Sequence, residues 1–270
     1  MTTPLRLLAM VAFGATLCAQ GTDTPAKVPA ALPYRLEVGG YGVDFNNGGG
    51  LWRGANATLW IRKNPRFIPA LTFDSRTSDA GTQRYYAFFS YANWTPNFFT
   101  TQSVSGTDAG GTTRLLFPRF RYDVKAWWKL PPRRSLVAGV GVSRYTLGSA
   151  GSGTMINPGL LFYKGSFVLD GEVFFNRTSP GALWSGSGLF AIQQGHEGRH
   201  WAGMTIGVGR QAYRELALAP LEVRYSSFSA DLFYRKWLTR NFGIAVSGGF
   251  QDARNSYQRY SFSTRAFFEF

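Results

Sequence analysis

The sequence is poor in cysteine, in charged residues and in long apolar runs. Its one cysteine, Cys18, lies near the N-terminus, so the rest of the chain can form no disulfide. Charged residues make up 16% of the chain, whereas about 25% is usual for a soluble globular domain. Beyond the N-terminal segment, no stretch reaches the roughly 18 apolar residues that indicate a transmembrane helix. These absences exclude a disulfide-rich scaffold and a helical membrane protein.

The N-terminal segment has the pattern of a secretory signal. One basic residue, Arg6, precedes an apolar stretch, and Ala19 offers a small residue for cleavage. The stretch is shorter than the about 20 residues of a spanning helix. A lipid anchor on Cys18 would need a small residue before it, and Leu17 is not small, so an anchor is the weaker interpretation. We therefore predict a signal peptide over residues 1–19 and export from the cytoplasm.

From residue 34 onward, apolar and polar residues alternate with the period of a β-strand. The closing segment shows this best, and its alternating apolar set is Tyr260, Phe262, Thr264, Ala266, Phe268 and Phe270. Such alternation, together with high glycine and aromatic contents, is typical of membrane-spanning β-barrels. The segment resembles the closing strand of a bacterial outer-membrane barrel. The resemblance implies that the signal read by the outer-membrane assembly machinery includes Tyr260, Phe262, Phe268 and Phe270.

Turn residues divide this region into 14 alternating segments. We predict strands that start near residues 34, 50, 66, 83, 97, 114, 135, 154, 166, 184, 200, 222, 242 and 257. Short and long connections alternate, as in barrels with short periplasmic turns and longer outer loops; residues 76–81 are predicted as one long loop. The segment at 97–105 is the weakest, and merging two weak pairs would leave 12 strands.

The predicted fold class is therefore all-β: a transmembrane, up-and-down, antiparallel β-barrel over residues 34–270, with 14 strands favoured over 12. Residues 20–33 are rich in Pro and Ala without periodicity, and we predict a short periplasmic tail there. Tryptophan and tyrosine gather at membrane surfaces, because the ring is apolar while its N–H or O–H needs water. Four aromatic residues near segment ends are expected in such girdles, unless they fill a soluble core: Trp128, Tyr163, Trp201 and Trp237.

The middle of the chain resembles a known family. Residues 115–148 contain a Phe-Pro step, a Leu-Pro turn and an Arg-Tyr strand, and residues 156–176 contain a Tyr-Lys-Gly turn. These features resemble YaiO-type outer-membrane β-barrels. The resemblance implies location in the outer membrane of a Gram-negative bacterium and offers no catalytic residues. We predict neither a bound metal nor a cofactor.

One string could indicate metal chemistry. His196, Glu197 and His200 match the H-E-x-x-H pattern of zinc peptidases, which needs a helix to bring both imidazoles to one side. Gly195 and Gly198 interrupt the string, and strands are predicted on both sides. We interpret it as a polar periplasmic turn. An outer-membrane enzyme acting on lipid or lipopolysaccharide stays as the alternative function, since such enzymes combine Ser or Thr with His and a carboxylate.

The polar face of the strands carries charged side chains that we predict to line the lumen. They are Arg35, Glu37, Arg62, Arg119, Arg121, Asp123, Lys125, Lys129, Asp170, Glu172, Arg259, Arg265 and Glu269. If they pair across a narrow interior, the barrel is closed. If the lumen is wide, the basic excess favours anionic solutes. Fourteen strands leave room for a channel unless side chains fill it, so a channel, transport or structural surface role is favoured.

The net charge of +14 bears on partners. Exposed Lys and Arg suit contact with outer-membrane lipid and phosphorylated lipopolysaccharide, whereas export makes nucleic acid an unsuitable partner. We expect a monomer, assembled by the outer-membrane machinery, with an anionic solute as the possible ligand.

Overall fold

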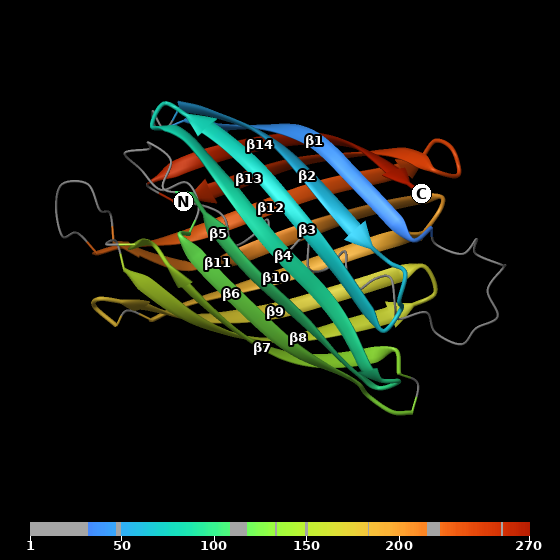
Figure 1. The fold of residues 1–270 in the computed structure, drawn as a ribbon. Helices are drawn as coiled ribbons and strands as arrows, with labels where there is room; N and C mark the ends of the chain where they lie inside the picture. Colours follow the sequence, from blue (N-terminus) through green and yellow to red (C-terminus); the bar gives the residue numbers. More distant parts are fainter. Residues whose placement is uncertain are drawn as a thin grey trace.

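Fourteen antiparallel strands close into one barrel (Figure 1), because β1 pairs with β14 as well as with β2. The computed structural model describes residues 32–46, 50–108, 118–132, 134–148, 151–182, 184–214, 222–254 and 256–270. The strands are β1 (Tyr34–Phe45), β2 (Gly50–Ile61), β3 (Phe67–Ser78), β4 (Gly81–Thr95), β5 (Phe98–Thr107), β6 (Phe120–Lys129), β7 (Leu136–Thr146), β8 (Ser152–Lys164), β9 (Phe167–Ser179), β10 (Trp184–His196), β11 (His200–Arg214), β12 (Glu222–Trp237), β13 (Phe242–Ala253) and β14 (Tyr257–Glu269). Closure pairs the backbone groups that an open sheet edge would leave unsatisfied in hydrocarbon.

The strand count confirms the prediction of 14, and the alternative of 12 is wrong. Thirteen strands begin within two residues of the predicted positions. The exception is β6, which begins at Phe120 rather than near residue 114, and Pro118 just before it has no N–H to donate to a ladder. Residues 109–117 lie outside the described part of the chain. The weakest predicted segment forms β5, which pairs with both β4 and β6. In the described residues, no helix has the length and apolar character to cross a membrane.

The connections between strands fall alternately at the two ends of the barrel. The C-terminus, the start of β1 and the connections that follow β2, β4, β6, β8, β10 and β12 lie at one end, here named the turn end (Figure 1). The opposite end is the loop end. One predicted loop is wrong, because residues 76–81 hold the end of β3 and the start of β4 around a tight turn. Gly81 has a φ of 113°, a conformation that glycine adopts without steric cost.

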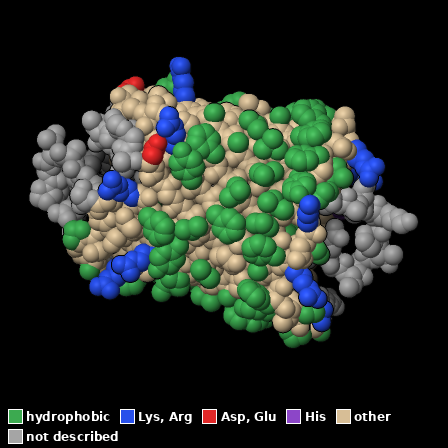
Figure 2. Space-filling view, viewed as in Figure 1, with side chains coloured by type: hydrophobic (Ala, Val, Ile, Leu, Met, Phe, Trp, Pro, Cys, Tyr) green, Lys and Arg blue, Asp and Glu red, His purple; other side chains and the backbone are tan. Residues whose placement is uncertain are grey.

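The outer face is apolar along the middle of the barrel. On β6, Tyr122, Val124 and Trp128 point outward and are 40–51% exposed. Figure 2 shows apolar side chains covering the wall in that view, with Lys and Arg concentrated toward the two ends. A band of this kind suits contact with lipid around the middle of the barrel.

Three of the four aromatic residues predicted for interfacial girdles lie inside the barrel instead. Tyr163 packs against an interior cluster, Trp237 is 5% exposed, and Trp201 shares the inner face with its cross-strand partner Arg235. Trp128 faces outward as predicted. The prediction failed for the other three because nearness to a strand end does not determine the face; odd or even position along the strand does.

Aromatic clusters fill much of the interior. The cluster toward the turn end contains Trp60, Ile68, Ala70, Tyr91, Phe99, Trp127, Val137 and Leu161. The cluster toward the loop end contains Tyr41, Val43, Phe45, Trp52 and Tyr85. Glycine on one strand makes room for a ring on the next: a Cβ at Gly139 would lie 2.3 Å from Cε3 of Trp127. The high glycine and aromatic contents are therefore linked through interior packing.

Candidate functional site

Seven charged side chains form one ion-pair network inside the turn end. This terminal network comprises Arg35, Glu37, Arg62, Glu197, Arg235, Arg265 and Glu269. Alternation along β1 and β14 places four of its members on the inner face. Arg35 and Glu269 are direct cross-strand partners where β1 meets β14. The pairing that closes the barrel therefore also positions the network.

Arg35 is the centre of the terminal network. Its Nε donates to Oε1 of Glu269 at 2.7 Å, and its guanidinium also contacts Glu37 and Glu197. Arg62 lies 3.1 Å from Glu197 and 3.2 Å from Glu269, measured from nitrogen to oxygen. Burial lowers the pKa of Arg62 and repulsion from Arg35 acts in the same direction, while the two carboxylates oppose them. Buried charges require such partners, because an unpaired ion in the interior costs several kcal/mol.

Aromatic rings support the guanidinium groups of the terminal network. Cζ of Arg35 lies 5.4 Å from the ring centre of Trp237 and 5.5 Å from that of Phe267. Cζ of Arg235 lies 5.0 Å from the Phe267 ring centre. All three distances are within the range of cation–π attraction. A Cβ at Gly243 would lie 2.2 Å from Cζ of Phe267, so glycine is needed beside this ring.

Glu197 joins strands that are well separated around the barrel. It lies in the turn between β10 and β11, and β12, β13 and β14 separate β11 from β1. Its carboxylate nevertheless contacts Arg35 on β1 and Arg62 at the end of β2. Nη2 of Arg235 on β12 donates to Oε1 of Glu37 on β1 at 2.7 Å, and only β13 and β14 lie between these two strands. The terminal network therefore connects walls across the lumen as well as adjacent strands.

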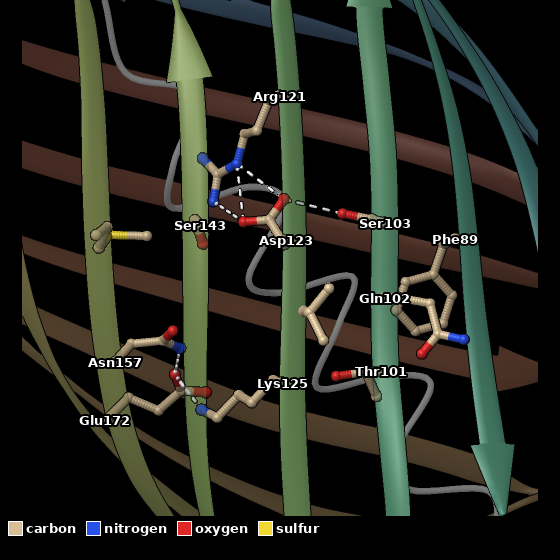
Figure 3. Close-up of a pocket in the computed structure, with 12 residues that line it drawn as sticks. Phe89, Thr101, Gln102, Ser103, Arg121, Asp123, Lys125, Ser143, Asn157 and Glu172 are labelled. Carbon is tan, nitrogen blue, oxygen red and sulfur yellow. Dashed lines mark hydrogen bonds and ion pairs between the residues drawn. The ribbon is translucent and has the colours of Figure 1, made fainter.

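A second group, here named the wall network, lies on β6 to β9 (Figure 3). Nζ of Lys125 lies 2.6 Å from Oε2 of Glu172, and Nδ2 of Asn157 donates to the same oxygen at 2.8 Å. Two strands separate Lys125 from Glu172. Gly141 and Gly159 on those strands leave a path for the lysine, since a Cβ at Gly159 would lie 2.9 Å from Nζ. The wall network thus links strands of a single wall.

A small cavity lies between the wall network and a neighbouring ion pair (Figure 3). In that pair, Nη2 of Arg121 is 2.6 Å from Oδ1 of Asp123, and Oγ of Ser103 donates to Oδ2 of Asp123 at 2.9 Å. The cavity has a volume of about 40 Å³. Such a space accommodates water molecules but no larger solute. The interior beside β5 to β9 is therefore closely filled around this cavity.

The 13 predicted lumen residues fall into three groups. Nine are buried: Arg35, Glu37, Arg62, Arg121, Lys125, Asp170, Glu172, Arg259 and Glu269. Asp123, Lys129 and Arg265 share the inner face and are half-buried, whereas Arg119 is exposed just before β6. Oδ1 of Asp170 is buried without a hydrogen-bond partner in the described structure. The structure brings five of the 13 into the terminal network and two into the wall network.

Sequence reasoning missed several interior charges. Arg235 could have been found, because it alternates with the outward residues Tyr234 and Lys236. Glu197 could not, because a turn residue has no alternating pattern to reveal its face. A third missed group lies toward the loop end. There, Oη of Tyr41 donates to Asp74 at 2.6 Å and accepts from Nε of Arg76 at 3.0 Å.

Opposite charges are nearly balanced inside the described barrel. Its inward cationic side chains are nine: Arg35, Arg62, Arg76, Arg121, Lys125, Lys129, Arg235, Arg259 and Arg265. Its inward carboxylates are eight: Glu37, Asp74, Asp123, Asp170, Glu172, Glu197, Asp231 and Glu269. Most of the chain's net charge of +14 therefore lies elsewhere than on these inward side chains.

Comparison with known families identifies the barrel. The YaiO membrane beta barrel domain matches residues 34–214, about two thirds of the chain. The chain belongs to this family. The resemblance stated from residues 115–148 and 156–176 is thereby confirmed. A search of curated proteins finds no match.

Solved structures similar to this YaiO-family barrel are outer-membrane β-barrels. A bacterial polysaccharide outer membrane secretin aligns with a TM-score of 0.60 at 7% identity, covering 90% of this chain and 100% of the other. The CymD monoaromatic hydrocarbon channel aligns with a TM-score of 0.57 at 8% identity, covering 89% of each chain. The outer membrane protein Omp33 of Acinetobacter baumannii aligns with a TM-score of 0.50 at 13% identity, covering 89% and 100%. At such identities the likeness shows the fold.

The H-E-x-x-H string forms the β10–β11 turn, as the sequence predicted. His196 and His200 are cross-strand partners on the outer face, while Glu197 turns inward to the terminal network. The string therefore does not direct its three side chains to one point, as a zinc peptidase requires. Within the described ranges, no group of three or more His, Cys, Asp or Glu could hold a metal ion.

Proposed function

We propose that this outer-membrane barrel is a channel for small, preferentially anionic solutes and that the terminal network closes its turn end at rest. The observation that carries the proposal is the contact of Glu197 with Arg35 and Arg62 across the lumen. Because Glu197 lies in a turn, it can leave the lumen without breaking the ladder of any strand. The same residue thus supplies both a closed state and a route to an open one.

Glu197 is more exposed to solvent than the two arginines that it contacts. The side chain of Glu197 is 19% exposed, whereas those of Arg35 and Arg62 are 4% and 3% exposed. Arg35 keeps Glu37 and Glu269 as partners when Glu197 withdraws, so its charge stays compensated. Two populated states of this kind need only a small free-energy difference between them. The similarity to a protein named as a hydrocarbon channel adds support for a conducting barrel.

The preference for anions follows from the composition of the terminal network. It contains four guanidinium groups and three carboxylates, one of which is Glu197. With Glu197 withdrawn, four cations face two carboxylates around the opening. A ring of arginine side chains favours the passage of anions.

Orientation and assembly complete the proposal. Short turns of barrels in this class face the periplasm, which places the turn end and the terminal network there. The proposal keeps residues 1–19 as the export signal and residues 20–33 as a short periplasmic tail, of which residues 1–31 lie outside the described residues. The outward aromatic side chains along β14 and at the residue after it provide the surface for the assembly machinery and are 48–61% exposed: Tyr260, Phe262, Phe268 and Phe270.

Replacing Glu197 by glutamine tests the closing role. Purified wild-type and Glu197→Gln barrels are compared in planar lipid bilayers under a KCl gradient. We expect the variant to spend about tenfold more time open, the factor that corresponds to about 1.4 kcal/mol, because the neutral amide holds Arg35 and Arg62 less strongly. The reversal potential should show preference for chloride. Equal conductance of the two proteins would contradict the closing role, and preference for potassium would contradict the anion preference.

The matched control changes the same turn but keeps the carboxylate. The double variant His196→Ala/His200→Ala removes two outward side chains beside Glu197 and should conduct like the wild type. A different result would support the alternative of a lipid-modifying enzyme. In that case neither the wild type nor Glu197→Gln conducts, and the wild type alters the lipid A of vesicles.

A further inference from the structure

A row of outward side chains crosses five strands near the loop end. Tyr122 of β6 pairs with Arg144 of β7, and Arg144 pairs with Thr154 of β8. Thr154 pairs in turn with Arg177 of β9, and Arg177 with Trp184 of β10. All five are exposed on the outer wall, and Cζ of Arg177 lies 5.9 Å from the ring centre of Trp184. These five residues are here named the arginine row.

The arginine row borders the apolar belt of the barrel. Two positions closer to the turn end, the outward residues of β6 to β9 are Val124, Val142, Ile156 and Phe175, again cross-strand partners in that order. They are 43–51% exposed. Two residues along a strand span about 6.6 Å. The row is therefore the first polar layer beyond the lipid-facing surface, where tyrosine and tryptophan rings are favoured.

The two arginines of the row form no ion pair within the described structure. The carboxylates of β6 to β10 are Asp123, Asp170 and Glu172, and all three share the inner face of the wall. The two guanidinium groups lie two strands apart, a separation of about 10 Å at the backbone, with the hydroxyl of Thr154 between them. The outer wall thus presents uncompensated positive charge beside apolar side chains.

Other sectors of the loop end lack this arrangement. Arg53 on β2 is exposed, but the neighbouring β1 carries the exposed outward residue Asp44, and on β13 the outward residue Asp252 is half-buried. Arg84 on β4 is exposed but pairs with Asp108 at 3.6 Å. Positive charge without a carboxylate on the same outer face is therefore a feature of β6 to β10 within the described barrel.

We propose that the arginine row is a binding site for the phosphate groups of lipopolysaccharide in the outer leaflet. Arginine suits this ligand, since its planar group donates two parallel hydrogen bonds to phosphate oxygens. A bound lipid would place its phosphates at the arginines and its acyl chains on Val142 and Phe175 below. The orientation with the loop end outward, given above, presents the row to that leaflet. The site does not depend on whether the barrel conducts.

The test measures binding of diphosphoryl lipid A to the purified barrel in detergent. The double variant Arg144→Ala/Arg177→Ala should bind about tenfold or more weakly than the wild type, since each charged hydrogen bond to phosphate is lost. The matched control, Arg53→Ala/Arg84→Ala, removes two exposed arginines at the same end of β2 and β4 and should bind like the wild type. Heat-dependent migration in gels shows that each variant is folded.

Three comparisons decide the outcome. Arg144→Lys/Arg177→Lys should retain more binding than the double alanine variant, because the charge is kept. Lipid A without phosphates should bind the wild type and Arg144→Ala/Arg177→Ala equally.

The proposal is overturned if both double alanine variants lose affinity equally, or if inorganic phosphate displaces lipid A at equal concentration, which would indicate a free-anion site. If the double alanine variant does not fold, the single variants Arg144→Gln and Arg177→Gln carry the same test, and unchanged binding in both would overturn it.

Discussion

Glu172 and Glu197 each hold buried cations inside the barrel, but they lie on different kinds of segment. Glu172 is part of the β9 ladder, and its partner Lys125 reaches it along one wall. Glu197 lies in a turn and contacts Arg35 and Arg62, with three or more strands between its own strands and theirs. The first pair is fixed by strand pairing on both sides. The second depends on a turn residue that takes no part in a ladder itself.

This difference teaches that ion pairs of similar chemistry can serve distinct purposes in one barrel. A pair within a wall restrains neighbouring strands and leaves the width of the lumen unchanged. An ion pair across the lumen restrains the opening of the lumen at the turn end. The wall network should therefore contribute to stability, and the terminal network to conduction through Glu197.

The largest effect is expected on stability when the wall pair is broken. Lys125→Met leaves Glu172 buried without a cation, which should lower the free energy of unfolding by about 3–5 kcal/mol. Urea unfolding of the barrel in lipid vesicles measures this loss. The double variant Lys125→Met/Glu172→Gln should recover most of it, because no unpaired charge stays in the interior. Full stability of Lys125→Met would show that water reaches Glu172 and that the wall is loosely packed.

A second, smaller effect is expected at the aromatic support of the terminal network. In Gly243→Ala the new Cβ would meet the Phe267 ring at 2.2 Å and the backbone oxygen of Lys236 at 2.3 Å. Overpacking of this kind costs about 1–3 kcal/mol. The shifted ring should also weaken its contacts with Arg35 and raise conductance. Urea unfolding and planar-bilayer recording measure the two effects.

Gly171→Ala is the control for that variant. It adds the same atom to a strand glycine with nothing within 4 Å of its Cβ position, so stability should change by no more than about 0.5 kcal/mol. An equal loss in both variants would mean that strand propensity, rather than space beside Phe267, determines the result.

Much of the fold could be predicted from the sequence because lipid imposes a strict pattern. Each strand must present apolar side chains outward at every second position, so the period of two reveals both strands and faces. β14 shows this directly, with Phe262 exposed and Ser263 buried. The signal was weaker for β5, where polar residues such as Gln102 interrupt the outward set, yet the segment still forms a strand.

The candidate site was less predictable, because the interior tolerates apolar and polar residues alike. Trp127 and Trp128 are adjacent, yet the first is 2% and the second 47% exposed. Alternation along β6 assigns Trp127 to the inner face, but it does not predict that the ring joins an aromatic cluster instead of lining a polar lumen. The sequence also does not show which charged residues pair. The approach of Lys125 to Glu172 depends on the register of three successive ladders. The inward position of Glu197 was the least predictable, because alternation cannot assign a turn residue to the inner or outer face.

Among the charged residues, the smaller stability effect is expected at Glu197, where the effect on conduction is expected to be largest. Glu197→Gln should lower the free energy of unfolding by less than about 1 kcal/mol, because the side chain is partly exposed and its amide can still accept a hydrogen bond from Arg35. The same urea unfolding as for Lys125→Met measures it. A loss as large as that of Lys125→Met would make Glu197 a structural strut of the barrel. A small loss together with raised conductance would separate the path-closing role of the terminal network from the strand-restraining role of the wall network.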